Sequence, residues 1–182
     1  MIDDAFRLGP VLGVGGMGVV YAATQCSLDR TVALKLPRPE LAADPEVRER
    51  FRTEALAGCR VNHRNVAHVL DFGDAGGVPY LVMEHVAGPR LGDLVLAHGP
   101  LPVAFAVELV GQILAGLGDA HGSGVIHSDV KCNNILVQTA RDGTAVPRLI
   151  DFGIARFVEA DGARRADAAR VIAGTPEYLA PE

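Results

Sequence analysis

The stretch that decides the fold is HSDVKCNN, which runs from His127 to Asn134. It is followed by DFG at residues 151–153 and by GTPEYLAPE at residues 174–182. An aspartate on its own is most often a turn-capping residue. Here Asp129 is followed by Asp151, with the ammonium group of Lys131 and the side-chain amide of Asn134 between them. This combination argues against the ordinary role for both aspartates. The stretch therefore predicts a site that combines two carboxylates, an amide and a cation.

Two further motifs lie upstream of this stretch. LGVGGMGVVY occupies residues 12–21, and VALK occupies residues 32–35. Apolar residues that alternate around the glycines predict antiparallel strands within residues 6–36, with a turn at residues 13–18. Small residues in such a turn let the backbone approach a ligand closely. The two motifs therefore predict a phosphate-covering hairpin beside a strand that carries a lysine.

Together, the five ordered motifs resemble those of serine/threonine protein kinases, and their wording is most similar to the eukaryotic-like (Hanks-type) kinases of bacteria. The resemblance extends over essentially all 182 residues, whereas a lone glycine-rich motif would be weak evidence. It implies an α+β, bilobal fold with an antiparallel β-sheet and one helix in the first lobe and a mainly helical, incomplete second lobe. It also implies transfer of the γ-phosphate of ATP, with Mg²⁺, to serine or threonine hydroxyls of a protein substrate.

The resemblance assigns roles to side chains at the reacting centre. Asp129 is the expected base for the substrate hydroxyl. Lys131 is expected beside the γ-phosphate, where a fixed positive charge stabilises the transferred group. Lys35 is expected to pair with Glu54 and to face the α- and β-phosphates; taken singly, the two would be a surface lysine and a solvated helical glutamate. Thr175 is expected to hydrogen-bond the catalytic aspartate and lysine.

The resemblance also assigns the metal and nucleotide contacts. Asn134 and Asp151 are the expected ligands of Mg²⁺, which prefers hard oxygen donors. Met83 is expected to guard the back of the nucleotide pocket, while the Glu84 carbonyl and the Val86 amide bond the adenine. Further nucleotide contacts are expected from Leu12, Gly13, Gly15, Gly18, Val20, Ala33 and Leu136. For the apolar members of this set, an ordinary core role is equally compatible.

Sequence patterns before residue 84 predict a β-rich first lobe. The Asp-Pro-Glu run at residues 44–46 predicts the start of a helix, and polar residues at 62–65 predict its end. Two more strands are predicted at residues 66–72 and 78–83, joined by a turn at residues 73–77. The helix is expected to turn one set of side chains toward the strands: Val47, Phe51, Glu54 and Leu56.

A composition shift near residue 84 predicts the boundary between two domains. We expect an N-lobe over residues 1–83, a hinge over 84–88 and a partial C-lobe over 89–182. Helices are predicted at residues 91–98 and 102–121. The second of these is apolar on nearly every face, which predicts a position inside the C-lobe.

Composition restricts the class of protein and its compartment. With 17 basic and 22 acidic residues, the formal charge of −5 argues against a general nucleic-acid binder that relies on phosphate neutralisation. Three widely spaced cysteines favour a reducing compartment, with the cytoplasm as the default. No signal peptide is evident, and the apolar stretch at residues 109–118 is interrupted and too short to span a bilayer. We therefore expect no membrane segment within the chain, although an anchor beyond residue 182 is left open.

Three departures from the kinase pattern carry their own expectations. Ser128 stands where the family usually has an arginine that binds a phosphorylated loop, and residues 154–173 contain no Ser, Thr or Tyr; activation by phosphorylation of that loop is therefore not expected. Gly58 should weaken its helix by about 1 kcal/mol and leave Glu54 loosely held. The sequence stops at Glu182, where the family continues with more helices, which predicts a fragment or a truncated product.

Two other functions remain open at this stage. One is a pseudokinase or ATP-binding regulatory module, which nucleotide binding without turnover would reveal. The other is a small-molecule phosphotransferase, whose catalytic loop resembles HGDxxxxN and hence residues 127–134. Lys131 and the peptide-docking pattern at residues 174–182 favour a protein as the substrate over a small molecule.

Overall fold

The structure is a computed structural model that describes residues 1–151, 156–157 and 178. The chain divides into two compact units. One comprises residues 1–59 with 67–86, and the other comprises residues 60–66 with the chain from residue 87 onward. The lobe limits and the hinge at residues 84–88 stay predictions.

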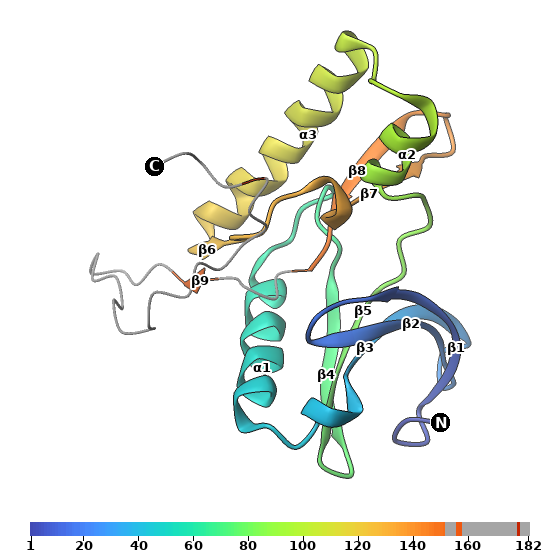
Figure 1. Ribbon diagram of the computed structural model, residues 1–182, viewed down its shortest axis with the longest axis vertical. Helices are drawn as coiled ribbons and strands as arrows, with labels where there is room; N and C mark the ends of the chain where they lie inside the picture. Colours follow the sequence, from blue (N-terminus) through green and yellow to red (C-terminus); the bar gives the residue numbers. More distant parts are fainter. Residues whose placement is uncertain (152–155, 158–177, 179–182) are drawn as a thin grey trace. The chain divides into compact units, whose positions relative to one another are not determined.

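The first unit is built on a five-stranded antiparallel sheet with the strand order β1-β2-β3-β5-β4 (Figure 1). Its central strand β3 pairs with β2 and β5, and its residues 32–35 are all buried. Because successive side chains alternate between the two faces of a strand, Leu34 and Lys35 face opposite sides. The antiparallel strands and the α+β class that the sequence predicts are confirmed. The strands are β1 (Phe6–Val14), β2 (Gly18–Gln25), β3 (Arg30–Pro37), β4 (Val69–Ala75) and β5 (Val78–Glu84).

Helix α1 (Pro45–Arg60) begins where the sequence predicts it. A short 3-10 helix, η1 (Pro39–Leu41), precedes it. The backbone N–H of Glu46 donates to the Asp44 carboxylate at 2.8 Å, which satisfies one of the donors that the first turn of a helix leaves unpaired. The aspartate therefore caps the helix, as its position before a proline predicts.

One face of α1 packs on the sheet and forms a core cluster with Leu81 of β5; its helical members are Val47, Phe51 and Ala55. Glu54 is buried in the same face. The expectation for Leu56 is wrong, because its side chain is 49% exposed. Five residues beyond Phe51, an α-helix has turned about 140° away from the buried face.

A second apolar cluster covers the opposite face of the sheet. It contains Phe6, Ala23, Val32, Leu34, Tyr80 and Val82. The rings of Phe6 and Tyr80 meet edge to face, with centroids 5.7 Å apart, and Ile2 of the N-terminal segment packs against the cluster. The sheet is therefore apolar on both faces, which explains why β3 reads as a continuous buried run.

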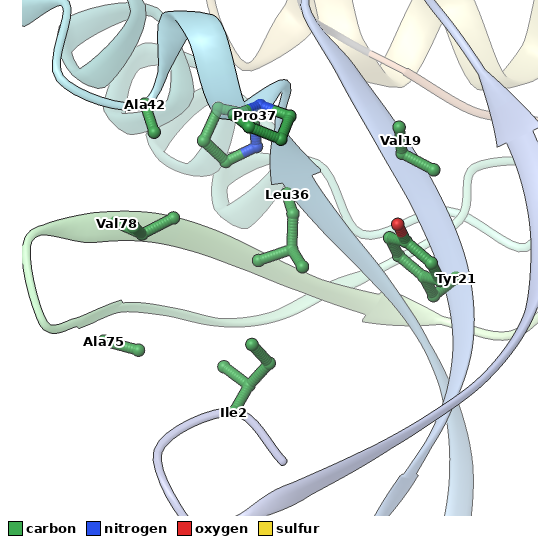
Figure 2. A pocket seen from close by; sticks show the side chains of 9 residues that line it. Ile2, Val19, Tyr21, Leu36, Pro37, Ala42, Ala75 and Val78 are labelled. Atoms are coloured by element: carbon green, nitrogen blue, oxygen red, sulfur yellow. The ribbon is translucent and has the colours of Figure 1, made fainter.

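An apolar pocket of about 290 Å³ lies beside this second cluster (Figure 2). Its wall includes Ile2, Tyr21 of β2, Leu36 of β3 and Val78 of β5. Tyr21 pairs with Leu34 in the ladder, so it shares the face of the sheet that points away from Lys35. The pocket is therefore separate from the site expected around that lysine.

The turn between β4 and β5 is tighter than the sequence analysis predicts. The predicted turn covers residues 73–77, whereas the strands continue to Ala75 and resume at Val78. Gly76 and Gly77 both have positive φ, at 62° and 91°, as two-residue hairpin turns require. The glycine pair alone makes the turn, and β4 begins later than predicted, at Val69.

The second unit combines two helices with small sheets (Figure 1). The predicted helices are confirmed as α2 (Leu91–His98) and α3 (Val103–Gly122). β7 (Ile135–Thr139) and β8 (Ala145–Leu149) form a hairpin, and β6 (Val125–Ile126) pairs with β9 (Arg156–Phe157). A 3-10 helix, η2 (Cys132–Asn134), leads into β7.

The segment that follows α1 is anchored in this second unit by buried hydrogen bonds. The Asn65 side chain donates to the Pro147 carbonyl at 2.8 Å and to Gln112 of α3 at 3.2 Å. Its own carbonyl accepts from the Leu149 amide at 2.8 Å. Asn65 is 2% exposed, and pairing of this kind offsets the cost of burying its amide.

Helix α3 is less buried than its composition predicts. Its buried face contains Leu109, Ile113, Gly116 and Ala120, and within the part of the chain that the structure describes the other side of the helix is exposed. The exposed apolar residues are Val103, Val107, Val110 and Leu114. By length and a mean hydropathy of 1.5, α3 could cross a membrane, a test that core helices of soluble proteins also pass. The expectation of no membrane segment therefore stays a prediction.

Gly58 corrects another expectation. A Cβ at this position would collide with the Val69 side chain at the start of β4. The glycine therefore lets α1 approach β4 closely, and the packing that follows holds the helix against the sheet. Glu54, one turn earlier, is 4% exposed and bonded through both carboxylate oxygens, so it is firmly held rather than loose.

We predict that Gly58→Ala lowers the free energy of unfolding, because overpacking costs about 1–3 kcal/mol against a helix-propensity gain of about 1 kcal/mol. Gly111→Ala in α3 is the matched control, since nothing lies within 4 Å of a Cβ there, and it should be stabilising. Urea unfolding of both variants measures the difference. Equal stabilisation by the two alanines would show that the contact with Val69 is not limiting.

Candidate active site

A buried ion pair joins β3 to α1. Lys35 Nζ lies 2.8 Å from both Oε1 and Oε2 of Glu54, and the two side chains are 7% and 5% exposed. The ammonium also lies 5.7 Å from the centre of the Phe51 ring, within the range of a cation–π contact. Strand alternation turns Lys35 toward α1, and the helical phase shared with Phe51 turns Glu54 toward β3. The structure thus brings these two predicted residues together.

The glycine-rich motif forms the hairpin between β1 and β2. Leu12 and Gly13 lie on β1, and Gly15 begins the turn, with its N–H donating to the Gly18 carbonyl at 2.8 Å. A Cβ at Gly18 would collide with the Leu36 carbonyl, whereas a Cβ at Gly16 would meet nothing within 4 Å. Internal packing therefore explains the glycine at 18. It does not explain the glycine at 16, where a small residue would allow a ligand to approach closely.

The strands beside this hairpin position the other nucleotide-site candidates of the first unit. Val20 pairs with Lys35, and Ala33 pairs with Met83. Ala33 and Lys35 are two residues apart on β3, so all four side chains lie on the same face of the sheet. Ala33 is 8% exposed. Glu84 ends β5, and Val86, two residues on, is buried. The remaining candidate, Leu136, is on β7 in the second unit, where it pairs with Arg148.

In the loop after β6, one carboxylate oxygen of a predicted site residue contacts two other predicted residues. Oδ2 of Asp129 lies 2.7 Å from Lys131 Nζ and accepts a hydrogen bond from Asn134 Nδ2 at 3.0 Å. Nδ2 also donates to the Asp129 carbonyl at 2.9 Å. Two backbone hydrogen bonds also hold the loop: the Asn134 N–H donates to the Lys131 carbonyl, and the Ile150 N–H donates to the backbone carbonyl of Asn134, both at 2.9 Å. Asn134 therefore shapes the loop that carries the candidate base.

His127 is hydrogen-bonded to this loop and is 1% exposed. Its Nε2 donates to the Ile150 carbonyl at 3.2 Å, and its Nδ1 accepts from the Asp129 amide at 3.3 Å. One nitrogen donates and the other accepts, so the ring is neutral in this arrangement. Burial lowers the pKa of His127 below its ordinary value, and the bond to Ile150 only partly opposes that shift. The packing against Phe152 that the sequence suggests lies outside the described residues.

The residues present suit a magnesium ion bound together with phosphates. Bonding of Nδ2 to Asp129 orients the Asn134 amide and leaves its oxygen Oδ1 as a candidate ligand atom. Asp151 supplies an exposed carboxylate from a residue with a φ of +66°. Among residues 1–151, 156–157 and 178, no three His, Cys, Asp or Glu side chains form a metal-holding group. Mg²⁺ typically takes one or two protein ligands and fills its sphere with phosphate and water.

Two further residues singled out by the sequence analysis are Thr175 and Ser128. Thr175 lies outside the residues that the structure describes, as does most of the stretch 154–173. Ser128 has a φ of +65°, a left-handed conformation that is uncommon for a residue other than glycine. Its position between His127 and Asp129 fits a sharp turn that directs both side chains to their partners.

The motifs did not point to His68, which contacts the end of β5. Its Nδ1 lies 3.0 Å from Glu84 Oε2, its backbone N–H donates to the same oxygen at 3.3 Å, and its carbonyl accepts from the Glu84 amide at 2.8 Å. Counting the hairpin register outward from Gly76 and Gly77 pairs Glu84 with Val69, and an irregularity between Val69 and Asp71 shifts the register by one residue. No signal in the sequence marks that shift, so the contact of His68 with Glu84 could not be predicted.

Comparison with known proteins agrees with this geometry. A model of the protein kinase domain matches residues 6–182. The chain belongs to the protein kinase domain family. The resemblance inferred from the motifs is therefore confirmed, together with the predicted kinase-like fold.

Three curated relatives of this kinase domain come from bacteria. Serine/threonine-protein kinase pkn3 of Myxococcus xanthus is 42% identical over 179 residues, which cover 97% of this chain and 33% of the relative. Serine/threonine-protein kinase pkn2 of the same organism is 43% identical, with 100% and 22% covered. PknB of Mycobacterium leprae is 41% identical, with 100% and 29% covered. The kinase domain chain thus spans about a third or less of these relatives.

We predict that His127 makes the stability of the domain depend on pH below 6.5. The unfolded chain binds a proton there that the buried imidazole resists, so stability is lost as the pH falls from the ordinary pKa of 6.5 toward the lowered folded pKa. The slope from this group is at most about 1.4 kcal/mol per pH unit. Urea unfolding between pH 5 and 7 should show a flatter dependence for His127→Asn than for the wild type.

His98→Gln removes an exposed imidazole at the end of α2 and serves as the matched control for that measurement. An equal flattening by both substitutions would contradict the role given to burial of His127.

Proposed function

We propose that this chain carries the nucleotide-binding and catalytic residues of a serine/threonine protein kinase that transfers the γ-phosphate of ATP to a protein hydroxyl. The observation that carries the proposal is the loop in which Lys131 and Asn134 both bond Oδ2 of Asp129. A carboxylate held by two donors keeps a defined direction, which a base must have to accept a proton during attack. The serine/threonine kinases among the relatives support the same class.

Lys35 is the proposed anchor of the α- and β-phosphates. Both oxygens of Glu54 hold its ammonium, so the cation is kept in one place without a bound nucleotide. An electrostatic group that is already oriented needs little reorganisation when charge moves in the transition state. The glycine turn at residues 15–18, the Glu84 carbonyl, the Val86 amide and the apolar set around Ala33 would bind the rest of the nucleotide.

Asn134 and Asp151 are the proposed ligands of Mg²⁺. When bound, the ion would neutralise charge on the phosphate oxygens and so favour attack on the γ-phosphorus. The protein's own part is to present two oxygen donors of the hard kind that this ion prefers. Lys131 would leave Asp129 in part to stabilise the transferred phosphoryl group, since one ammonium has three N–H donors.

The second candidate function is that of a pseudokinase, which would bind ATP without turnover. Ser128, in place of the arginine usual in the family, is the observation that favours it. The candidate base, the two candidate magnesium ligands and the Lys35–Glu54 pair are all present, which favours the active enzyme. The substrate protein is proposed only as a chain with serine or threonine hydroxyls. A cytoplasmic location of this region and the absence of nucleic-acid binding are likewise proposals.

We predict that Asp129→Asn abolishes phosphotransfer in the intact protein and leaves ATP binding within about twofold, because it removes the proton acceptor and spares the first unit. Asp142→Asn is the matched control. Asp142 is an exposed aspartate in the β7–β8 turn, where it bonds Thr144, and that variant should keep full turnover. Transfer to a protein substrate and nucleotide titration are measured in parallel. Turnover of Asp129→Asn at the wild-type rate would remove Asp129 from the role of base.

We predict that Lys35→Met lowers kcat/KM by about two orders of magnitude or more, where each factor of ten corresponds to about 1.4 kcal/mol of transition-state stabilisation. The same change also destabilises the fold by about 3–5 kcal/mol, because it leaves the buried Glu54 carboxylate without this ammonium. The double variant Lys35→Met, Glu54→Leu separates the two effects, since apolar replacement of a buried ion pair is often neutral for stability.

The double variant should regain stability in urea unfolding and remain inactive. Recovery of turnover together with stability would mean that the ammonium acts only on folding, and the proposed phosphate anchor would then be wrong.

A further inference from the structure

Arg38 bonds both limbs of the glycine-rich turn. It lies directly after β3, and its backbone N–H donates to the Met17 carbonyl at 3.2 Å. Its side-chain Nε donates to the Gly15 carbonyl at 3.0 Å. One residue therefore holds the limb that leaves β1 and the limb that enters β2.

The backbone bond continues the ladder between β2 and β3. Gly18 pairs with Pro37 in that ladder, so Met17 and Arg38 form the next position along it. Proline has no N–H to give to the ladder, and Arg38 supplies the first donor beyond it. The side-chain bond has no counterpart in a regular sheet, because it crosses the turn and draws Gly15 toward the end of β3.

A second arginine reaches the same turn from α1. Arg50 Nη1 lies 3.6 Å from Met17 Sδ, a contact with a weak acceptor. Arg38 itself has another neighbour, since its Nη1 lies 3.9 Å from the exposed Glu40 carboxylate. Neither of these contacts bridges the two limbs of the turn. The Gly15 N–H bonds the Gly18 carbonyl within the turn itself at 2.8 Å, and the bond from Arg38 Nε to the Gly15 carbonyl adds a side-chain link from the end of β3.

Closure of this turn matters because glycines otherwise leave it conformationally free. A chain of glycines loses more conformational entropy on ordering than any other sequence of the same length. If the turn is ordered before the nucleotide binds, less of that entropy is lost at the moment of binding, and the affinity rises. The bonds from Arg38 supply such ordering from within the protein.

We propose that Arg38 is a positioning residue that holds the glycine-rich turn in its nucleotide-covering shape through the bond from Nε to the Gly15 carbonyl. The proposal deepens the proposed function and rests on it for the role of the turn. Arg38 acts through the backbone of residues 15–17, and its effect appears in nucleotide affinity more than in the rate of the chemical step.

Two substitutions of matched length test the bond. In Arg38→Gln, the side-chain amide nitrogen stands the same number of bonds from Cα as Nε does, so the donor is kept and the charge is lost. In Arg38→Met, a methyl group takes that place and no donor remains. Both variants keep the backbone bond to Met17. Arg52→Met is the control, because Arg52 is an exposed residue of α1 that lies 3.7 Å from Glu49.

The first measurement is amide hydrogen exchange of the intact, ligand-free protein over residues 13–19. Arg38→Met should exchange about two- to tenfold faster than the wild type, the range that corresponds to the net contribution of one hydrogen bond. Arg38→Gln and Arg52→Met should stay close to the wild type. Unchanged exchange in Arg38→Met, or equal acceleration in the Met and Gln variants, overturns the proposal.

The second measurement is steady-state kinetics with MgATP as the varied substrate. Arg38→Met should raise the KM for ATP about two- to tenfold with kcat nearly unchanged, and Arg38→Gln should restore most of the affinity. A fall in kcat with an unchanged KM would overturn the positioning role. If the wild type itself neither binds nor turns over ATP, the proposed function fails, and hydrogen exchange still decides whether Arg38 orders the turn.

Discussion

The ion pair between Lys35 and Glu54 is the interaction on which the rest of the first unit depends. Two charges buried to this extent cost several kcal/mol each unless they are paired with good geometry. The pair is satisfied only if α1 lies along the sheet with Glu54 inward and if β3 keeps the register that turns Lys35 toward it. The apolar contacts of Phe51 and the close approach at Gly58 meet the same requirement. Packing and charge therefore select one placement of the helix.

The second unit depends on an amide rather than on a charge. Asn134 bonds the carbonyl and the carboxylate of Asp129 and, through its backbone, both ends of the segment from Lys131 to Ile150. The residue that is the candidate metal ligand is thus also the residue that folds the loop. A substitution at Asn134 would alter metal binding and the direction of Asp129 together, so its effect on activity cannot be divided between the two roles.

Elements with strong local signals were predictable from the sequence. Capping residues indicate the helix start at Asp44, and apolar periodicity indicates the two helices after residue 90. Alternation of apolar residues indicates the strand that contains Lys35. The errors arose where a local signal is ambiguous. Five turn-forming residues at 73–77 contain several possible turns, and only the pairing of β4 with β5 selects Gly76 and Gly77. The prediction that Leu56 is buried was wrong because an apolar residue next to a buried helix face need not belong to that face.

The sequence by itself determined the family and the identity of the candidate catalytic residues, because chemistry requires those residue types in that order whatever their surroundings. Only the tertiary structure decided what those residues touch. From the sequence alone, Gly58 is interpreted as a weak point of its helix, whereas in the structure it makes room for Val69. Arg38 and His68 belong to no motif. Only the pairing of the strands places them next to Gly15 and Glu84, respectively. The physical reason is that contacts between distant residues depend on register and helical phase. A shift of one position in either moves a side chain to another face.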